Sequence, residues 1–208
     1  MRHNPGWAAY PGPMANFLTK DLDTTDGYKL LLGLIVPRPI GWIGSRSADG
    51  VNNLAPFSFF GAVCANPPTV VFGASRAARR DTTANVLDTG VFTVNIVTSE
   101  VIDKVVASAA PIPSDTDEFD HAGLTPVMGT EVNAPMVGEA RARLECRLSH
   151  HVQLGEDHGT DVIFGEIVAY HVDDDLLDGT RIDQAGLHAV GSHVANTYSR
   201  ISDFFTVD

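Results

Sequence analysis

An alternation of apolar and polar side chains over residues 140–154 constrains the fold of this chain more than any other feature. A period of two is typical of a strand with one buried face and one wet face, as in an antiparallel sheet. The side chains expected on the buried face are Ala140, Ala142, Leu144, Cys146, Leu148, His150, Val152 and Leu154. The residues between them, Glu145 included, are expected to face water.

Further segments rich in Val, Ile and Phe predict strands at residues 39–46, 51–60, 69–73, 91–97 and 162–172. The turn signal Ala48-Asp49-Gly50 predicts a hairpin between the first two. Helices are expected only at residues 28–34, from Asp81 to just before Gly90, and from residue 99 to about 110. Many strands and no regular βαβ alternation predict a mostly β protein with a few helices, a closed or nearly closed antiparallel barrel rather than a Rossmann domain. The GxGxxG, GxxxxGK[ST] and HExxH motifs are absent.

Length and charge exclude several classes of protein. The 208 residues suit one domain, and 14 basic against 26 acidic residues give a net charge of −12, which argues against general affinity for nucleic acid or anionic membrane. The longest apolar run, residues 30–36, is far shorter than the roughly 20 residues that span a bilayer. Cys64 and Cys146 form no CxxC pattern, so a reducing cytoplasm is expected.

Residues 1–25 are expected to form an extended N-terminal arm, and residues 26–208 a single domain. The arm combines three prolines with the large rings of Trp7 and Tyr10. These rings could pack on a neighbouring surface, including another subunit. The alternative is a frayed tail.

Positive charge is concentrated between residues 38 and 80, where five arginines face a single acid, Asp49. These arginines are Arg38, Arg46, Arg76, Arg79 and Arg80. A basic stretch in an acidic chain suits an anionic small molecule, because the remaining surface would repel it. The alternative is a solvated loop whose arginines pair with carboxylates elsewhere.

The end of this stretch favours the anionic ligand. Arg79 and Arg80 lead directly into the predicted helix, which Asp81 or Thr82 is placed to cap. Free N–H groups, the positive end of the helix dipole and guanidinium groups would then meet, which is a phosphate site. A second segment, residues 52–60, places amides beside a proline and several aromatic rings. It could hold a flat heteroaromatic ring, or it could be an ordinary core strand.

Several motifs together resemble the flavin reductase-like family of FMN-binding split barrels. In order, they are residues 36–45 (VPRPIGWIGS), 53–58 (NLAPFS), 66–68 (NPP), 80–82 (RDT) with Asn85, and 90–95 (GVFTVN). The resemblance covers roughly residues 28–172. Residues 144–146 and 165–168 resemble the family's second half, but a longer connection follows Gly155-Glu156-Asp157-His158 than the usual Gly-Asp-His pattern has.

The resemblance implies a homodimeric split β-barrel with FMN near the subunit interface. It assigns the phosphate and ribityl end of FMN to Ser75, Arg80, Asp81, Thr82 and Asn85. It assigns the ring end to Ser45, Asn53, Leu54, Ala55, Pro56, Phe57 and Ser58. Trp42 either lies close to the ring or belongs to the core. His158 and His193 are candidates for the substrate side, although His158 could equally be a surface loop residue, and Ser192 stands where the family commonly has an arginine.

No metal site is predicted from the eight histidines. His150 and His151 are adjacent on a strand and point to opposite faces, while His188 and His193 lack the i, i+4 spacing of a helical pair.

The function expected from the resemblance is that of an NAD(P)H:flavin reductase that passes hydride to FMN and supplies a monooxygenase partner. Hydride transfer requires stacked rings rather than a nucleophile, which agrees with the absence of a catalytic triad. Two alternatives stay open. The protein could keep its FMN and reduce an organic substrate such as a nitroaromatic acid, or it could be an FMN-binding electron carrier. Without a Rossmann fingerprint, the sequence gives no preference between NADH and NADPH.

Overall fold

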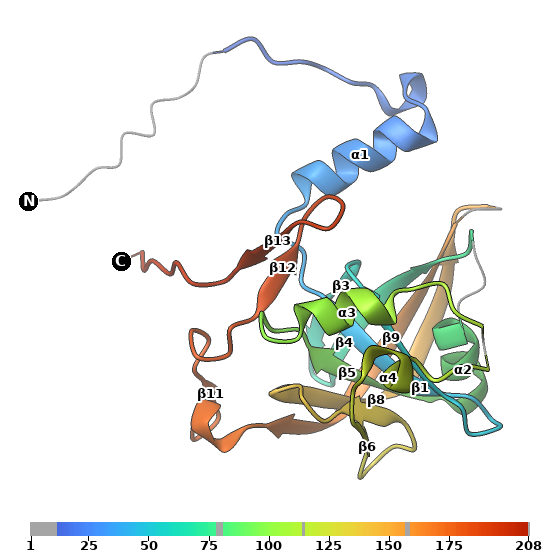
Figure 1. The fold of residues 1–208 in the computed structure, drawn as a ribbon. Coiled ribbons are helices and arrows are strands. Elements are labelled where there is room, and N and C mark those ends of the chain that lie inside the picture. The colour runs from blue at the N-terminus through green and yellow to red at the C-terminus, as the bar shows by residue number, and fades with distance from the viewer. Residues whose placement is uncertain (1–11, 78–80, 114, 157–158, 208) are drawn as a thin grey trace, which may run out of the picture. The chain divides into compact units, whose positions relative to one another are not determined.

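Seven antiparallel strands form the main sheet of the protein, in the order β2-β1-β5-β8-β9-β4-β3 (Figure 1). They are β1 (Gly41–Arg46), β2 (Asn52–Phe57), β3 (Phe60–Ala65), β4 (Pro68–Ser75), β5 (Val91–Ile96), β8 (Ala142–Leu154) and β9 (Thr160–Val172). The computed structural model describes residues 12–77, 81–113, 115–156 and 159–207. The predicted strands are confirmed, except that the strand expected at residues 51–60 ends at Phe57, and β3 was not predicted.

The sheet curls until its two ends meet. The rings of Phe57 on β2 and Phe72 on β4 lie 4.9 Å apart between centroids, and the Gly73 amide donates a 2.7 Å hydrogen bond to the carbonyl oxygen of Phe59. The first strand of the sheet order, β2, is thus in contact with the sixth, β4, as in the predicted closed or nearly closed barrel.

The predicted hairpin joins β1 and β2, in a register that places Ser45 opposite Asn53. Gly50 has a φ of +88° in the connecting turn, a conformation that glycine adopts without steric cost. This turn fixes which residues of the two strands face each other, and so it fixes the site described below.

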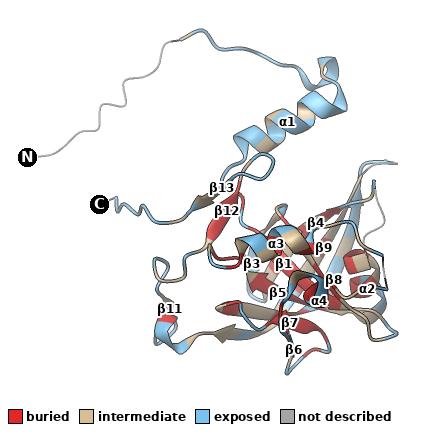
Figure 2. Cartoon of the chain, in the orientation of Figure 1, coloured by how far each residue is buried: buried red, intermediate tan, exposed pale blue. Residues whose placement is uncertain are grey.

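Two hydrophobic cores lie on opposite faces of β1. Ile43 belongs to the cluster inside the barrel, with Phe72 and Phe92, whereas Trp42 belongs to an outer cluster with Leu54 and Phe119. Because both faces of the strand are covered, its first four residues, Gly41–Gly44, carry no polar chain ends except the Trp42 indole N–H. Figure 2 shows the buried residues gathered in the barrel strands and the short helices beside them.

Three helices accompany the barrel: α2 (Asp81–Thr89), α3 (Ile102–Ser108) and α4 (Glu118–Ala122). The first two confirm predicted helices, and α4 was not predicted. The remaining elements are short: β6 (Pro126–Met128), β7 (Pro135–Val137), the 3-10 turn η2 (Asp174–Leu176), β10 (Leu177–Asp178), β11 (Arg181–Ile182), β12 (Val190–Ser192) and β13 (Tyr198–Arg200). Elements of two to five residues carry too little periodicity to be read from sequence.

The N-terminal residues up to Ile35 form a unit separate from Val36–Asp208. It contains the 3-10 turn η1 (Thr19–Asp21) and α1 (Thr24–Leu34), whose N-cap Asp23 accepts a 2.8 Å hydrogen bond from the Asp26 amide. The helix expected at residues 28–34 is confirmed, with an earlier start. Trp7 and Tyr10 lie outside the described residues, so the proposed arm of residues 1–25 stays a prediction. Among the described helices, none is both long and apolar enough to cross a membrane.

The predicted burial pattern of residues 140–154 is partly wrong. Glu145, expected to face water, is fully buried because the loop between β6 and β7 covers that face of β8. His150, Val152 and Leu154, expected to be buried, are exposed. The register shifts between Leu148 and His150, so one extra residue moves the following side chains to the other face.

Candidate functional site

Four of the predicted site residues form one hydrogen-bonded group where the β1–β2 hairpin meets the first turns of α2. Ser45 Oγ donates to Asn53 Oδ1 at 3.1 Å, and Thr82 Oγ1 donates to the same oxygen at 2.7 Å. Asn85 Nδ2 donates to Ser45 Oγ at 3.2 Å. We call Ser45, Asn53, Thr82 and Asn85 the Asn53 network.

The Asn53 network is buried, and its least covered member, Asn85, is only 8% exposed. Its polar atoms bind one another across the β1–β2 hairpin and α2. The network therefore holds the start of α2 against β1 and β2. It is a buried support between these elements rather than an open surface.

Glu118 of α4 completes this arrangement and was missed by the sequence analysis. Its Oε1 accepts a 2.7 Å hydrogen bond from Asn53 Nδ2, and its Oε2 accepts a 3.2 Å hydrogen bond from the Leu54 amide. Burial raises the pKa of Glu118, and the neighbouring charge of Asp117 adds to this, while the hydrogen bonds act in the opposite direction. Glu118 lies 65 residues from Asn53 in the chain, and no local motif links the two.

The backbone amides at the start of α2 are candidates for binding an anion, although Asp81 places a negative charge in the same turn. The first N–H groups of a helix lack partners within the helix, and they carry the positive end of its dipole. Thr83, in the first turn, is only 7% exposed, and its Oγ1 has no hydrogen-bond partner among the described residues. An unpaired buried hydroxyl is unfavourable unless a ligand or water pairs with it. Ser75 is exposed at the end of β4, where its Oγ accepts from the Ala77 amide at 3.2 Å.

The described arginines of the basic stretch do not gather at one point. Arg46 donates to the Gly50 carbonyl at 3.1 Å, and Arg76 donates to the Gly155 carbonyl at 2.6 Å. Arg38 reaches the β12 end instead. Their partners include backbone carbonyls, whereas the alternative drawn from the sequence had them pair with carboxylates. Arg79 and Arg80 lie outside the described residues, so the phosphate role of Arg80 stays a prediction.

A small pocket of about 160 Å³ lies at the far end of β2. Pro56 and Ser58, two of the predicted ring residues, line it together with Ile40, Val105, Ser192 and Tyr198. The Arg38 guanidinium donates to Ser58 Oγ and Ser192 Oγ, both at 3.4 Å, and to the His193 carbonyl at 2.6 Å. The pocket thus combines an apolar wall with hydroxyl groups held by a buried cation.

The other predicted ring residues have mixed surroundings. Trp42 and Leu54 are fully buried in the outer core, and the Trp42 indole donates to Ser108 Oγ at 2.9 Å. Phe57 belongs to the inner core, with Ala55 packed against it. For Trp42, the structure therefore agrees with the core alternative weighed above.

The two histidines proposed for the substrate side differ in what the structure shows. His193 directly follows Ser192 at the end of β12, and its Nε2 is buried with no partner among the described residues. His158 lies outside the described residues. Within the part of the chain that the structure describes, no three or more His, Cys, Asp or Glu side chains are grouped as a metal site would need.

The structure combines an antiparallel barrel with a buried polar network beside a helix start and a small pocket further along β2. The model of the flavin reductase-like domain matches residues 32–189, and this chain belongs to that family of flavoprotein oxidoreductases. A protein of Aquifex aeolicus without assigned function is 43% identical over 165 residues, covering 78% of this chain and 83% of its own.

Two crystal structures extend the comparison. Nitrilotriacetate monooxygenase component B from Bacillus cereus is 33% identical, with a TM-score of 0.91, and covers 94% of this chain and 100% of its own. A Shewanella frigidimarina protein with a split barrel domain is 26% identical, with a TM-score of 0.83, and covers 94% of this chain and 99% of its own. The predicted family is confirmed, and the split-barrel class agrees with the curled sheet.

Proposed function

We propose that this protein is an NAD(P)H:flavin oxidoreductase that passes hydride from a nicotinamide to FMN. The observation that supports this most strongly is the buried Asn53 network at the start of α2, in a chain of the flavin reductase-like family. A flavin ring supplies the hydride-accepting chemistry, so the protein has to bind, orient and shield it. This explains why no nucleophile is required.

The groups at the start of α2 suit the phosphate of FMN. The unpaired Thr83 hydroxyl and the first N–H groups of α2 suit a phosphate. Pro56 lies three residues along β2 from Asn53, about 10 Å at the usual rise of a strand, and opens onto the pocket. Because the side chains of Asn53 and Pro56 are an odd number of residues apart on the strand, they point to opposite faces of β2, so the proposed phosphate site and the pocket are separate parts of the site.

The pocket also favours a second candidate function. Its apolar wall and its two serine hydroxyls suit a small ring compound with polar substituents. In this alternative, the protein keeps its FMN and reduces an organic substrate directly, such as a nitroaromatic acid. Dependence of NAD(P)H oxidation on free FMN separates the two functions.

The family match also supports a partner protein. The Bacillus cereus relative is named as one component of a monooxygenase. We propose that this protein likewise delivers reduced FMN to a monooxygenase, in the cytoplasm, where its two free cysteines would stay reduced.

A homodimer is part of the same proposal. On α1, the side chains of Tyr28, Leu31 and Leu34 are about half exposed or more, and on the edge strand β3 Val63 is 52% exposed. Apolar side chains on a helix and on a sheet edge are typical of surfaces that a second subunit covers.

Deleting residues 1–20 is expected to weaken the dimer, because it removes the aromatic N-terminal segment, including Phe17 and Leu18, which are 60% and 50% exposed. Sedimentation velocity over a range of protein concentrations measures the effect. Full-length protein should sediment as a dimer, and the shortened protein should shift toward monomer. An unchanged distribution would show that this segment has no role in assembly.

Arg80→Ala is expected to weaken FMN binding by about 1–3 kcal/mol, the range for losing a hydrogen bond to a charged group. The neighbouring Asp81 lies in the first turn of α2 and would repel a phosphate, so the arginine charge is needed beside it. Fluorescence titration of FMN measures the affinity. Arg181→Ala, on β11 outside the proposed site, is the control and should leave the affinity unchanged. Equal affinity for Arg80→Ala and the native protein would reject the phosphate assignment.

A further inference from the structure

The amide of Asn53 has a fixed direction, because each of its two ends is used. Its oxygen accepts from Ser45 and Thr82, and its nitrogen donates to Glu118 Oε1. A carboxylate can only accept hydrogen bonds, so it selects the Asn53 orientation in which the nitrogen points toward α4. The same carboxylate accepts from the Leu54 amide with its second oxygen, which holds it in place.

The neighbouring pair, Asn52 and Asp117, is bonded in a different way. Asn52 Nδ2 donates to Asp117 Oδ2 at 2.9 Å, so it too is an amide on β2 bonded to a carboxylate at α4. The Asn52 oxygen, however, is buried and has no partner among the described residues. The Asn52 amide can therefore turn over without breaking a second hydrogen bond, whereas the Asn53 amide cannot.

The orientation of the Asn53 amide affects α2, the helix whose start is the proposed phosphate site. Thr82 lies in the first turn of α2 and donates to Asn53, while Asn85, one turn along, donates to Ser45. If the Asn53 amide turned over, its N–H groups would face the hydroxyl protons of Ser45 and Thr82. Both hydroxyls would have to reorient, and the hydrogen bonds that hold this part of α2 to the barrel would be lost or rearranged.

We propose that Glu118 is a positioning residue for flavin binding: it fixes the donor direction of the Asn53 network and thereby the placement of the first turns of α2. The assignment rests on the proposed function, since FMN is the ligand whose phosphate would lie at this helix start. Glu118 itself is bonded to Asn53 and Leu54, and it acts on the ligand only through them.

Glu118→Gln tests the assignment because it changes hydrogen-bond direction with little change in size. The introduced glutamine has one donor end, which meets either the Asn53 nitrogen or the Leu54 amide, so one pair of donors must face each other. We expect FMN to bind about tenfold more weakly, as for the loss of about one good hydrogen bond.

Asp117→Asn is the matched control for this variant. Asn52 can turn its unused oxygen toward the side-chain amide of the introduced asparagine, so no donors are forced together. Asparagine is also a good N-cap for α4. FMN affinity should therefore stay within about twofold of the native value.

The double variant Asn53→Asp with Glu118→Gln separates the effect of hydrogen-bond direction from a general loss of stability. The introduced glutamine then donates to one oxygen of the introduced aspartate and accepts from the Leu54 amide. The other aspartate oxygen still accepts from Ser45 and Thr82, and the number of negative charges is the same as in the native protein. FMN affinity should recover to near the native value, whereas a role in stability alone would leave affinity unchanged in all three variants.

The measurement is titration of FMN fluorescence and absorbance at a temperature where circular dichroism shows every variant folded. Native protein that binds FMN, weak binding by Glu118→Gln and recovery in the double variant support the assignment. Native affinity in Glu118→Gln, or no recovery in the double variant, overturns it and leaves the proposed function standing. Native protein that binds no FMN overturns both.

Discussion

Glu145→Gln is expected to lower the free energy of unfolding by about 3 kcal/mol, as for a buried charged group that loses its hydrogen bonds. The Glu145 carboxylate is fully buried and accepts hydrogen bonds from the amides of Thr130, Glu131 and Val132, at 2.8–2.9 Å. His171 Nε2 lies 2.6 Å from the same carboxylate. A glutamine presents an N–H₂ group to these donors, so at least one buried amide loses its acceptor.

Glu145 also makes the free energy of unfolding depend on pH. Burial alone would raise the pKa of Glu145, but the hydrogen bonds from Thr130, His171 and Glu131 outweigh it and lower the pKa from 4.5 to about 2. A carboxyl group whose pKa is lower in the folded than in the unfolded protein stabilises the fold at pH values above its unfolded pKa. For Glu145 this stabilisation amounts to about 3 kcal/mol. This stabilisation is lost as the pH falls from about 5 towards 2.

Denaturant unfolding at pH 7 and at several lower pH values measures both effects. The free energy of unfolding of the native protein should fall steeply below about pH 5. The Glu145→Gln variant should have a lower free energy of unfolding at pH 7, and this value should fall less steeply with acid. Glu166→Gln, an exposed position on β9, is the control and should behave as the native protein does. A Glu145→Gln variant with native stability at pH 7 would contradict the role given to the carboxylate.

Gly44→Ala is expected to destabilise the barrel by about 3 kcal/mol or more, above the middle of the range for overpacking a core. A Cβ at Gly44 would overlap the backbone carbonyl oxygen of Pro135 on β7, and it would also meet Thr93 Oγ1. The carbonyl belongs to the main chain and accepts a hydrogen bond from Thr93 Oγ1, so it cannot move aside cheaply. The close approach of β7 explains why the strand needs glycine immediately before Ser45.

Gly61→Ala is the matched control, because Gly61 also lies in a strand but a Cβ there meets nothing within 4 Å. Alanine at position 61 should be neutral or slightly stabilising, since it reduces the freedom of the unfolded chain. Thermal and denaturant unfolding of both variants give the comparison. Similar stabilities for the two variants would contradict the close contact between β1 and β7.

The main strands could be predicted because their residues carry a repeating signal. Val, Ile and Phe mark β4, β5 and β9, and the Ala48-Asp49-Gly50 turn sets the β1–β2 hairpin. Burial within β8 could not be predicted in full. Glu145 is buried by a loop that pairs three backbone amides with its side chain, and the register shift before His150 has no local signature.

Some residues of the candidate site could likewise be predicted from the sequence, and others could not. The resemblance selected Ser45, Asn53, Thr82 and Asn85, and the structure brings their side chains together. It could not select Glu118, because the contact joins β2 to a five-residue helix far along the chain. Charge counting also suggested one basic patch, whereas Arg38 and Arg76 bind different parts of the protein.

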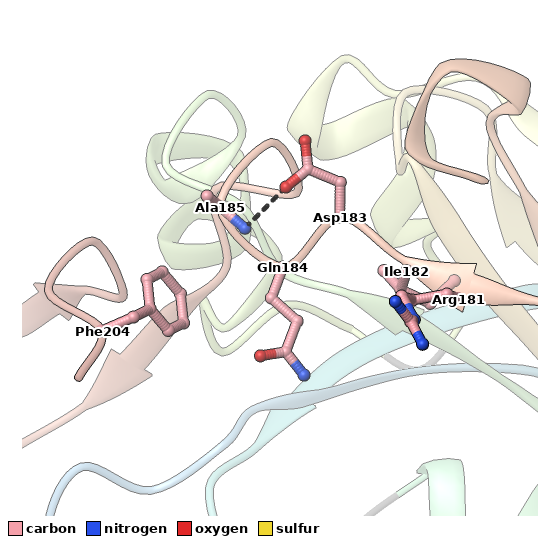
Figure 3. Close-up of a pocket in the computed structure, with 6 residues that line it drawn as sticks. All are labelled: Arg181, Ile182, Asp183, Gln184, Ala185 and Phe204. Carbon is pink, nitrogen blue, oxygen red and sulfur yellow. Dashed lines mark hydrogen bonds between the residues drawn. The ribbon is translucent and has the colours of Figure 1, made fainter. Parts of the chain in front are cut away.

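The surface offers other hollows, which differ in character from the proposed site. The one drawn in Figure 3 is lined by residues 181–185 and by Phe204 of the C-terminal segment. The Asp183 carboxylate there accepts from the Ala185 amide at 3.1 Å, so its polar group is already used within the loop. It contains none of the residues that the family resemblance selected.

The most direct test of flavin reduction is anaerobic NAD(P)H oxidation by the purified protein, with and without a large excess of free FMN. Oxidation that scales with added FMN, well beyond one turnover per protein, is the expected result. Oxidation limited to one NAD(P)H per bound FMN would contradict release of reduced flavin and favour direct reduction of an organic substrate. A protein that binds no FMN and oxidises no NAD(P)H would contradict the proposed function altogether.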